Sequence, residues 1–297
     1  MTRTVLKSMR ISTGFVTALL VATGCGGGGG SGDGDDQGGG MDAPTSPPDS
    51  GSPPDAPPDS QPPPPVDAPD GAPPEDCRSL SVVFRDFKSS HSDFGEDDPH
   101  WGARPSPGLV AATLSADGKL VFVRGGSVPV PEGTSPGQIT SADTLAQWYA
   151  DVPGVNLTIP QTLTLQENSP GIYGFESSKF YPLDGMGWND TAIGADGGPH
   201  NFLFTTEIHT QFQYHANQTF SFRGDDDLWL FINGRLAIDL GGVHMPAEQV
   251  VNLGQIAATF GLVEGQTYKM DIFHAERRPN GSNFKVQTSI SCFTDPG

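Results

Sequence analysis

Almost all aromatic side chains of this 297-residue chain lie in one part of it, and only that part can form a hydrophobic core. Residues 77–297 hold 25 of the 26 Phe, Trp and Tyr residues. Residues 26–76 hold none, and instead carry ten Asp, one Glu, 14 Pro, 12 Gly and no Lys or Arg. Such a segment cannot bury enough apolar surface to offset its conformational entropy. We therefore expect residues 26–76 to be a disordered tether and residues 77–297 to be one folded domain.

Residues 1–25 have the pattern of an export signal. Three basic residues within the first ten precede an apolar segment, residues 11–22, which is too short to span a bilayer as a helix. The sequence Thr-Gly-Cys then ends at Cys25 and resembles a bacterial lipobox, which implies that Cys25 is acylated. An ordinary cleaved signal is the alternative. We expect a lipid-anchored protein of the bacterial cell envelope, at the outer membrane or cell surface.

The charge balance excludes nucleic acid as the default partner. The chain has 35 acidic and 16 basic residues, a formal net charge of −19, whereas binding to phosphates requires a basic surface. The folded region contributes 24 acidic and 13 basic residues, so it is acidic in its own right.

Two cysteines remain if Cys25 is lipidated, and they lie near the two ends of the folded region. Cys77 and Cys292 would close almost the whole domain if they were bonded. Two free buried thiols are the alternative, but an exported protein is in an oxidising environment. We expect a Cys77–Cys292 disulfide.

The folded region has the pattern of an all-β domain with little helix. Short segments rich in Val, Ile, Thr and aromatic residues alternate with turn residues, and there is no alternation of strands with helices. Two short helices are expected at residues 142–150, where Ser141 can cap, and 255–260. We predict an antiparallel β-sandwich. Its expected strands are residues 81–87, 119–123, 156–165, 202–214, 219–223, 228–232, 235–240, 267–274 and 283–291.

The clearest hairpin joins residues 228–232 to residues 235–240 through Asn233-Gly234. Asn-Gly is typical of a two-residue type I′ turn, which sets the register of the strands. A regular hairpin would place Ala237 opposite Leu230 and Asp239 opposite Leu228. The first strand is apolar on both faces, so we expect its Trp229 and Phe231 to be buried between two layers.

An acidic cluster should form at the open end of this hairpin. Asp239 would return beside three consecutive carboxylates, those of Asp225, Asp226 and Asp227. Carboxylates this close repel one another unless a cation neutralises them, and hard oxygen ligands suit Ca²⁺. Zn²⁺ is the weaker alternative, with His244 and His274 as the nearby nitrogen ligands. A solvated acidic turn, whose Asp side chains cap backbone N–H groups, is equally compatible with the residues.

Two tryptophans lie in expected loops, and the sequence does not decide whether they bind a ligand. Trp188 lies in a Gly-rich stretch and Trp101 follows an acidic one, so each could contact a ligand or pack its own loop.

Several motifs of the folded region resemble the fibro-slime domain. They are RGDDDLWLFINGRLAIDLGGVH at residues 223–244, FRDF at 84–87, HSDF at 91–94, FHAERR at 273–278 and SNF at 282–284. The fibro-slime domain in turn is similar to the protective-antigen-like lectin sandwich of fungal flocculins and adhesins.

This resemblance implies a Ca²⁺ site. In those lectins an Asp-Asp pair joined by a cis peptide binds Ca²⁺, and sugar hydroxyls complete its coordination. The pair matches Asp225 and Asp226, whereas Asp227 stands where the lectins have a small residue. A second loop matches residues 274–283, with Glu276, Asn280 and Asn283 as candidate ligands, and Trp188 would contribute to sugar binding and specificity.

These features predict a binding protein and not an enzyme. The sequence has no Gly-x-Ser-x-Gly elbow and no His-Glu-x-x-His motif, and a cluster of acids suits a metal better than an acid/base pair. We expect a surface lipoprotein with a calcium-dependent, adhesin-like domain that binds extracellular or cell-surface polysaccharide. The alternative is a structural or self-associating module of an extracellular matrix.

Overall fold

The computed structural model describes residues 75–95, 103–124, 139–279 and 281–296. Contacts divide the chain into residues 1–66 and residues 67–297, and all described residues belong to the second unit. Cys25 and the tether up to residue 74 lie outside the described residues, as do Trp101 and Asn280.

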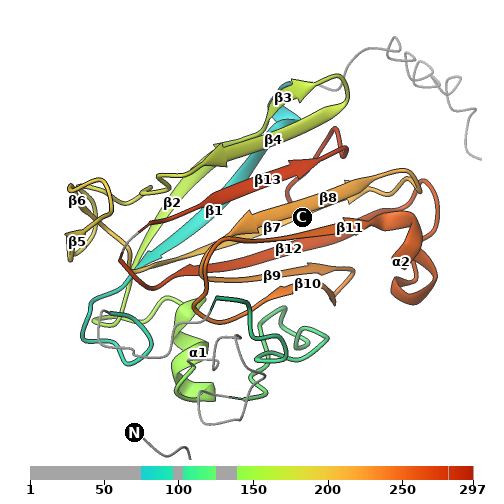
Figure 1. The fold of residues 1–297 in the computed structure, drawn as a ribbon. Coiled ribbons are helices and arrows are strands. Elements are labelled where there is room, and N and C mark those ends of the chain that lie inside the picture. Colours follow the sequence, from blue (N-terminus) through green and yellow to red (C-terminus); the bar gives the residue numbers. More distant parts are fainter. Residues whose placement is uncertain (1–74, 96–102, 125–138, 280, 297) are drawn as a thin grey trace, which may run out of the picture. The chain divides into compact units, whose positions relative to one another are not determined.

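The first sheet has six antiparallel strands in the order β10-β9-β12-β7-β1-β2 (Figure 1). The long central strands β7 and β12 pair along their whole length, from Thr267 opposite Gln213 to Glu276 opposite Phe204. The strands span Arg235–Leu240 (β10), Asp227–Ile232 (β9), Thr267–Glu276 (β12), Phe204–Gln213 (β7), Ser79–Asp86 (β1) and Leu157–Thr164 (β2).

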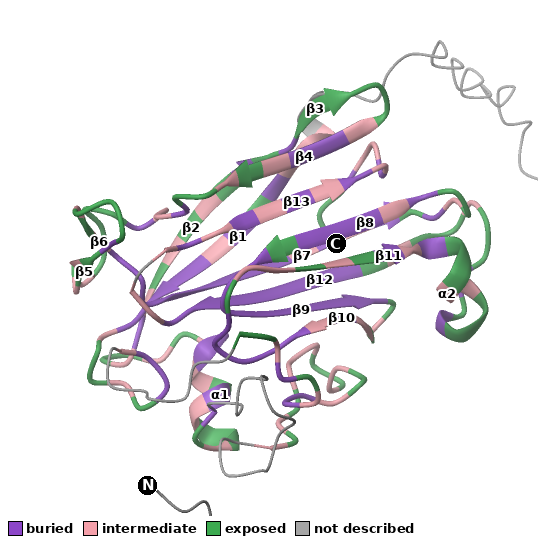
Figure 2. Ribbon diagram, in the orientation of Figure 1, coloured by how far each residue is buried: buried purple, intermediate pink, exposed green. Residues whose placement is uncertain are grey.

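The second sheet has five antiparallel strands in the order β11-β8-β13-β4-β3. They span Ala247–Asn252 (β11), Thr219–Gly224 (β8), Phe284–Thr288 (β13), Ile172–Ser177 (β4) and Gln166–Ser169 (β3). A separate hairpin is formed by β5 (Ala192–Ile193) and β6 (Pro199–His200). Figure 2 shows that β7, β9 and β12 are largely buried and that the edge strand β3 is exposed.

The main core fills the space between these two sheets. Phe84 and Ile208 of the first sheet belong to the same buried cluster as Phe222 and Phe284 of the second. Because successive side chains of a strand point to opposite faces, each strand gives alternate residues to this core. The prediction of an antiparallel β-sandwich is confirmed.

A second apolar cluster covers the outer face of the six-stranded sheet. Trp229 and Phe231 of β9 are fully buried in it, as expected, and they pack with Leu145 and Trp148 of α1. The other face of β9 contributes its alternate residues to the main core. The two helices, α1 (Ala142–Trp148) and α2 (Leu253–Phe260), form near their expected positions, and Ser141 caps α1 as expected. Neither helix combines the length and apolar character that crossing a membrane requires.

The expected strand at residues 119–123 does not form, and five strands of the described residues were not predicted. Phe122 makes only an isolated bridge to Val110, because this apolar run packs against the outer face of the sheet instead of joining it. The unpredicted strands are β3, β4, β5, β6 and β11. Each of the edge strands β3 and β11 has too few buried residues to show an apolar alternation.

The register of the β9–β10 hairpin differs from the prediction. Asn233 and Gly234 both have positive φ, as the two-residue turn requires, and Ile232 lies opposite Arg235. An irregularity between Leu236 and Ile238 then shifts the pairing by one residue. Asp239 therefore lies opposite Trp229 and not opposite Leu228, and Ile238 takes the place expected for Ala237 opposite Leu230.

A disulfide joins Cys77 and Cys292, which confirms the expected bond. Their Cα atoms are 4.9 Å apart, although 215 residues separate them in the sequence. The N–H of Phe293 also donates to the carbonyl of Cys77 at 2.7 Å, so the two ends of the domain are hydrogen-bonded beside the bridge.

Removing this disulfide should strongly destabilise the domain. In the chain-entropy model a closed loop of this length is worth about 5 kcal/mol. We expect the double variant Cys77→Ala/Cys292→Ala to lose up to that amount in urea unfolding at neutral pH. Reductant should lower the stability of the wild type and leave the variant unchanged; equal stability of the two proteins without reductant would contradict the expectation.

A group of charged side chains lies on the outer face of β7. The carboxylate of Glu207 is 3% exposed and accepts hydrogen bonds from Arg85 at 2.6 Å, Lys119 at 2.9 Å and His209 at 2.9 Å. His209 also bonds to Asp271 at 2.6 Å. Burial lowers the pKa of His209, but the hydrogen bonds to Asp271 and Glu207 outweigh it and raise this pKa to about 9.

Stability should therefore fall at alkaline pH because of His209. Its pKa is higher in the folded state than the ordinary 6.5, so its contribution is complete below pH 6.5 and is lost as the pH rises through about 9. Partial exposure of the ring screens the effect to roughly 1 kcal/mol. His209→Gln should flatten this part of the stability curve in urea titrations. An unchanged slope in His209→Gln would refute the assignment.

Candidate cation and ligand site

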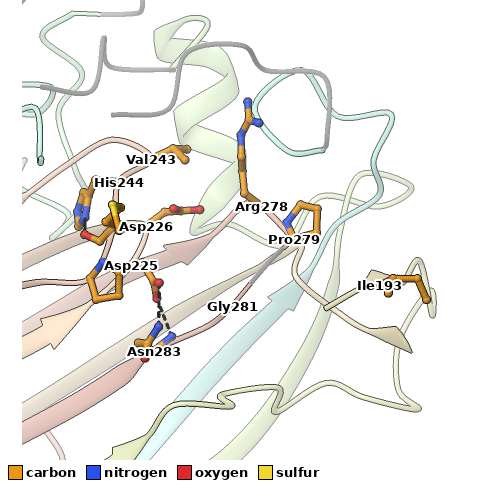
Figure 3. Close-up of a pocket in the computed structure, with 11 residues that line it drawn as sticks. Ile193, Asp225, Asp226, Val243, His244, Arg278, Pro279, Gly281 and Asn283 are labelled. Carbon is orange, nitrogen blue, oxygen red and sulfur yellow. Dashed lines mark hydrogen bonds between the residues drawn. The ribbon is translucent and has the colours of Figure 1, made fainter. Parts of the chain in front are cut away.

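The Asp225–Asp226 pair lies in the turn between β8 and β9, at one end of the sandwich. The peptide bond between the two residues is cis, as the resemblance implied. Both side chains line a pocket of about 660 Å³ (Figure 3). The other lining residues are Ile193, Val243, His244, Met245, Pro246, Arg278, Pro279, Gly281 and Asn283.

Asp225 is held by the start of β13. Asn283 donates to it twice, from its backbone N–H to Oδ1 at 2.6 Å and from its side-chain Nδ2 to Oδ2 at 3.0 Å. This contact depends on Gly224, because a Cβ at that position would lie 2.6 Å from the carbonyl oxygen of Asn283. Burial raises the pKa of Asp225, and the two bonds from Asn283 oppose that rise.

His274 fixes the backbone of Asp225 from inside the core. Its Nε2 bonds to the carbonyl oxygen of Asp225 at 3.0 Å, and its Nδ1 lies 3.1 Å from the hydroxyl of Thr206. The ring is fully buried among aromatic side chains, including Phe180 and Phe284, and burial lowers its pKa to about 4. A neutral ring must donate from Nε2, because a carbonyl oxygen can only accept. His274 thus lies close to the acidic turn, as expected, but its nitrogens are engaged in these bonds.

Two further carboxylates near Asp225, those of Asp226 and Glu276, are buried. Asp226 is 5% exposed, and burial together with the charges of Asp225 and Asp227 raises its pKa to about 8 against the opposing effect of Arg277. Glu276 is 1% exposed, and burial followed by the charges of Asp226 and Asp225 raises its pKa well above the ordinary value. Its Oε2 atom is buried and has no hydrogen-bond partner among the described residues.

Asp227 is engaged by a buried guanidinium. Nε of Arg277 donates to Asp227 Oδ2 at 2.7 Å, its NH2 group lies 2.6 Å from the same oxygen, and the N–H of Gly242 donates to Oδ1 at 2.5 Å. The backbone N–H of Arg277 donates to Asp226 Oδ2 at 3.0 Å. One residue therefore contacts two of the three consecutive aspartates.

Asp239 faces the second apolar cluster. Its carboxylate accepts from the N–H of Gly108 at 2.8 Å and from Trp229 Nε1 at 3.1 Å, and it does not line the pocket. The register shift of β10 explains this placement, since it moves Asp239 by one position and hence to the other face. The expected pairing of Asp239 with Leu228 is therefore wrong. Burial raises the pKa of Asp239, and the charge of nearby Asp227 adds to this rise, so Asp239 stays close to the acidic turn without lining the pocket.

Trp188 packs against its own surroundings. Its backbone N–H donates to the buried carboxylate of Asp86, and Lys88 Nζ lies 3.7 Å from the centre of its ring. It is not among the residues that line the pocket.

The residues around the pocket offer oxygen ligands to a hard cation. Asp225, Asp226 and Asn283 line the pocket, and Glu276 adds a buried oxygen without a partner. The elevated pKa values show that these acids are under-neutralised, and a cation would relieve this. Among the described residues, however, no three His, Cys, Asp or Glu side chains are grouped as a metal site. A Ca²⁺ ion would therefore also need amide or backbone oxygens, which it accepts readily.

The sequence located the acidic turn, nearby His244 and the loop that ends at Asn283, but it did not reveal the aliphatic part of the pocket lining. Val243, Met245 and Pro246 follow the glycines after β10, and Ile193 comes from the β5–β6 hairpin. Arg277 belongs to the FHAERR motif at residues 273–278, but the motif did not indicate a role for it. Its position directly after a strongly apolar strand was the available signal, because a charged residue there needs a buried partner.

The two sheets form an antiparallel β-sandwich with the acidic turn at its end. Residues 186–294 match the family model of the PA14 domain, which confirms the protective-antigen-like part of the resemblance.

Similar proteins come from Dictyostelium discoideum. Protein psiR is 37% identical over 193 residues, which cover 62% of this chain and 18% of psiR. Protein psiQ is 35% identical over 227 residues, 73% of this chain and 21% of psiQ. The chain thus spans about a fifth of the length of these relatives.

Among solved structures, the PA14 sugar-binding domain from an RTX adhesin matches 43% of this chain and 80% of its own, with 12% identity and a TM-score of 0.26. The PA14 domain of the MpAFP antifreeze protein matches 30% and 46%, with 11% identity and a TM-score of 0.23.

Arg277→Ala should destabilise the domain by about 3–5 kcal/mol, because it leaves buried Asp227 without its cation. Arg277→Lys should recover part of this loss. Urea unfolding measures both, and Arg223→Ala, which removes an exposed arginine of β8, is the control. A loss below about 1 kcal/mol in Arg277→Ala would show that the pair is dispensable.

Proposed function

We propose that this domain binds carbohydrate through a Ca²⁺ ion held at the Asp225–Asp226 turn. The observation that carries the proposal is the pair of neighbouring carboxylates that line a pocket in a PA14-like sandwich. Burial raises the pKa of both carboxylates, and the charges of Asp225 and Asp227 add to the rise at Asp226, so a cation at the turn would offset the cost of keeping these acids ionised. Binding, and not catalysis, is the activity that such a grouping supports.

The proposed ligands are the carboxylates of Asp225 and Asp226, with Glu276 and Asn283 as further oxygen donors. Asn283 orients the Asp225 carboxylate by its two bonds, and His274 holds the Asp225 carbonyl. Ca²⁺, when bound, supplies open coordination positions for neighbouring sugar hydroxyls. Asp227 neutralises Arg277 and so acts on the site indirectly.

The proposed setting is outside the cell. The expected export signal and lipidation at Cys25, followed by an acidic tether, would present the domain on a surface, and extracellular polysaccharide would be the partner. The relatives named above come from Dictyostelium discoideum, so they add nothing in favour of a bacterial envelope. Mass analysis of the mature N-terminus in the native host tests the anchor: an unmodified or absent Cys25 would overturn it.

Asp226→Asn should weaken Ca²⁺ binding at least tenfold without unfolding the domain. With a pKa of about 8, Asp226 is largely protonated at pH 7 in the cation-free protein, and an amide has the shape of that protonated form. Calorimetric titration of the purified chain with CaCl₂ measures the change. The exposed Asp117→Asn is the matched control. An unchanged affinity in Asp226→Asn would move the cation elsewhere.

Binding to a glycan array should depend on Ca²⁺. We expect binding that EDTA abolishes and added CaCl₂ restores. If no glycan binds in an EDTA-sensitive way although Ca²⁺ itself binds, the domain is a calcium-stabilised structural or self-associating module instead. If Ca²⁺ does not bind either, the proposed function is wrong.

A further inference from the structure

Two exposed apolar side chains line the same pocket as the carboxylates. Ile193 is 65% exposed and Met245 is 56% exposed, and both line the pocket. They come from separate segments, the β5–β6 hairpin and the loop between β10 and β11. In Figure 3, Ile193 lies on the other side of the pocket from Asp225 and His244. The pocket thus combines an acidic part with aliphatic walls.

The hairpin that presents Ile193 is held in place by polar contacts. His200, opposite Ala192 in the hairpin, bonds to Asp184 at 2.5 Å through Nδ1 and to Asp196 at 3.1 Å through Nε2. Its ring also stacks on Tyr181, with 3.8 Å between ring centres. These contacts of His200 fix the β5–β6 hairpin that contains Ile193.

The loop that presents Met245 is fixed as well. His244 is 4% exposed, and its ring nitrogens lie 2.7 Å from the carbonyl oxygen of Met245 and 3.1 Å from that of Leu240. The N–H of Gly242, earlier in the same loop, donates to buried Asp227. The segments that carry Ile193 and Met245 are therefore both fixed before a ligand binds. Such preorganisation lowers the conformational entropy lost on binding.

Aliphatic walls select a different sugar feature from aromatic ones. None of the described residues that line the pocket is Phe, Tyr or Trp, so the flat stacking of a sugar ring on an aromatic face is not offered by them. Val243, Pro246 and Pro279 add further aliphatic surface to that of Ile193 and Met245. A small apolar group beside the polar hydroxyls complements this lining, and on a saccharide that group is a methyl.

We propose that the pocket selects saccharides that carry a methyl group, as a 6-deoxy sugar or an N-acetyl sugar does, and that Ile193 and Met245 are its specificity-determining residues. This inference rests on the proposed Ca²⁺-dependent binding. The hydroxyls of the sugar meet the acidic turn, and the methyl group contacts the aliphatic side chains. Burying one methyl group corresponds to about fourfold in Kd.

Matched sugar pairs test the proposal with the full chain in saturating CaCl₂. L-Rhamnose and L-mannose differ only in the 6-hydroxyl group, and N-acetylglucosamine and N-formylglucosamine differ only in the methyl of the acyl group, so the two pairs separate the two sources of the methyl group. NMR titration measures each Kd. We expect the methyl-bearing sugar of at least one pair to bind about fourfold more tightly than its partner.

Substitutions then test whether Ile193 and Met245 cause the preference for the methyl-bearing sugar. In Ile193→Ser and Met245→Ser the ratio of Kd values should fall toward one, while Ca²⁺ affinity and thermal stability stay unchanged. Val263→Ser is the matched control, because Val263 is also 60% exposed but does not line the pocket. Equal binding within both pairs, or an undiminished ratio in both variants, overturns this inference alone. Loss of all Ca²⁺-dependent sugar binding in the wild type overturns the proposed function with it.

Discussion

The buried guanidinium of Arg277 makes the acidic end of this sandwich possible. Several carboxylates lie here out of contact with water, and burying them without a counter-charge would be strongly unfavourable. Arg277 is 1% exposed and pairs with Asp227, while its backbone N–H binds Asp226. Its NH1 group also donates to the carbonyl of Asp93 at 3.2 Å, and its guanidinium carbon lies 4.8 Å from the ring centre of Trp148. One side chain therefore joins the acidic turn to the layer that covers the outer face of the sheet.

Patterns that depend on neighbouring residues could be predicted from the sequence. Strand β9 is apolar on both faces, and the sequence already indicated that Trp229 and Phe231 are buried between layers. The Asn233-Gly234 turn was equally clear. The irregularity after Leu236 was not, because no Gly or Pro marks it and it depends on how the strand packs. That single shift left Asp239 outside the pocket lining, so a one-residue error in register changed the expected metal ligands.

The residues of the site also divide into those that the sequence could indicate and those that only the fold brings together. Its acidic turn is continuous in the sequence, and the resemblance linked it to the loop that contains Asn283. The aliphatic side of the pocket is assembled from segments far apart in the chain, and one of them, Ile193, lies in a two-residue strand that no periodicity reveals. The ion pair of Asp227 with Arg277 spans 50 residues, so the sequence showed that Asp227 departs from the lectin pattern but did not show its partner.

The Cys77–Cys292 bridge has a mechanical consequence. Tension applied to the chain on either side of the domain would pass from one half-cystine to the other through a covalent bond, and the strands between them would lie outside the path of the load. Hydrogen-bonded sheets yield to force far more easily than covalent bonds do. The 215-residue span that carries the acidic turn and its pocket would thus keep its shape while the polypeptide on both sides is stretched.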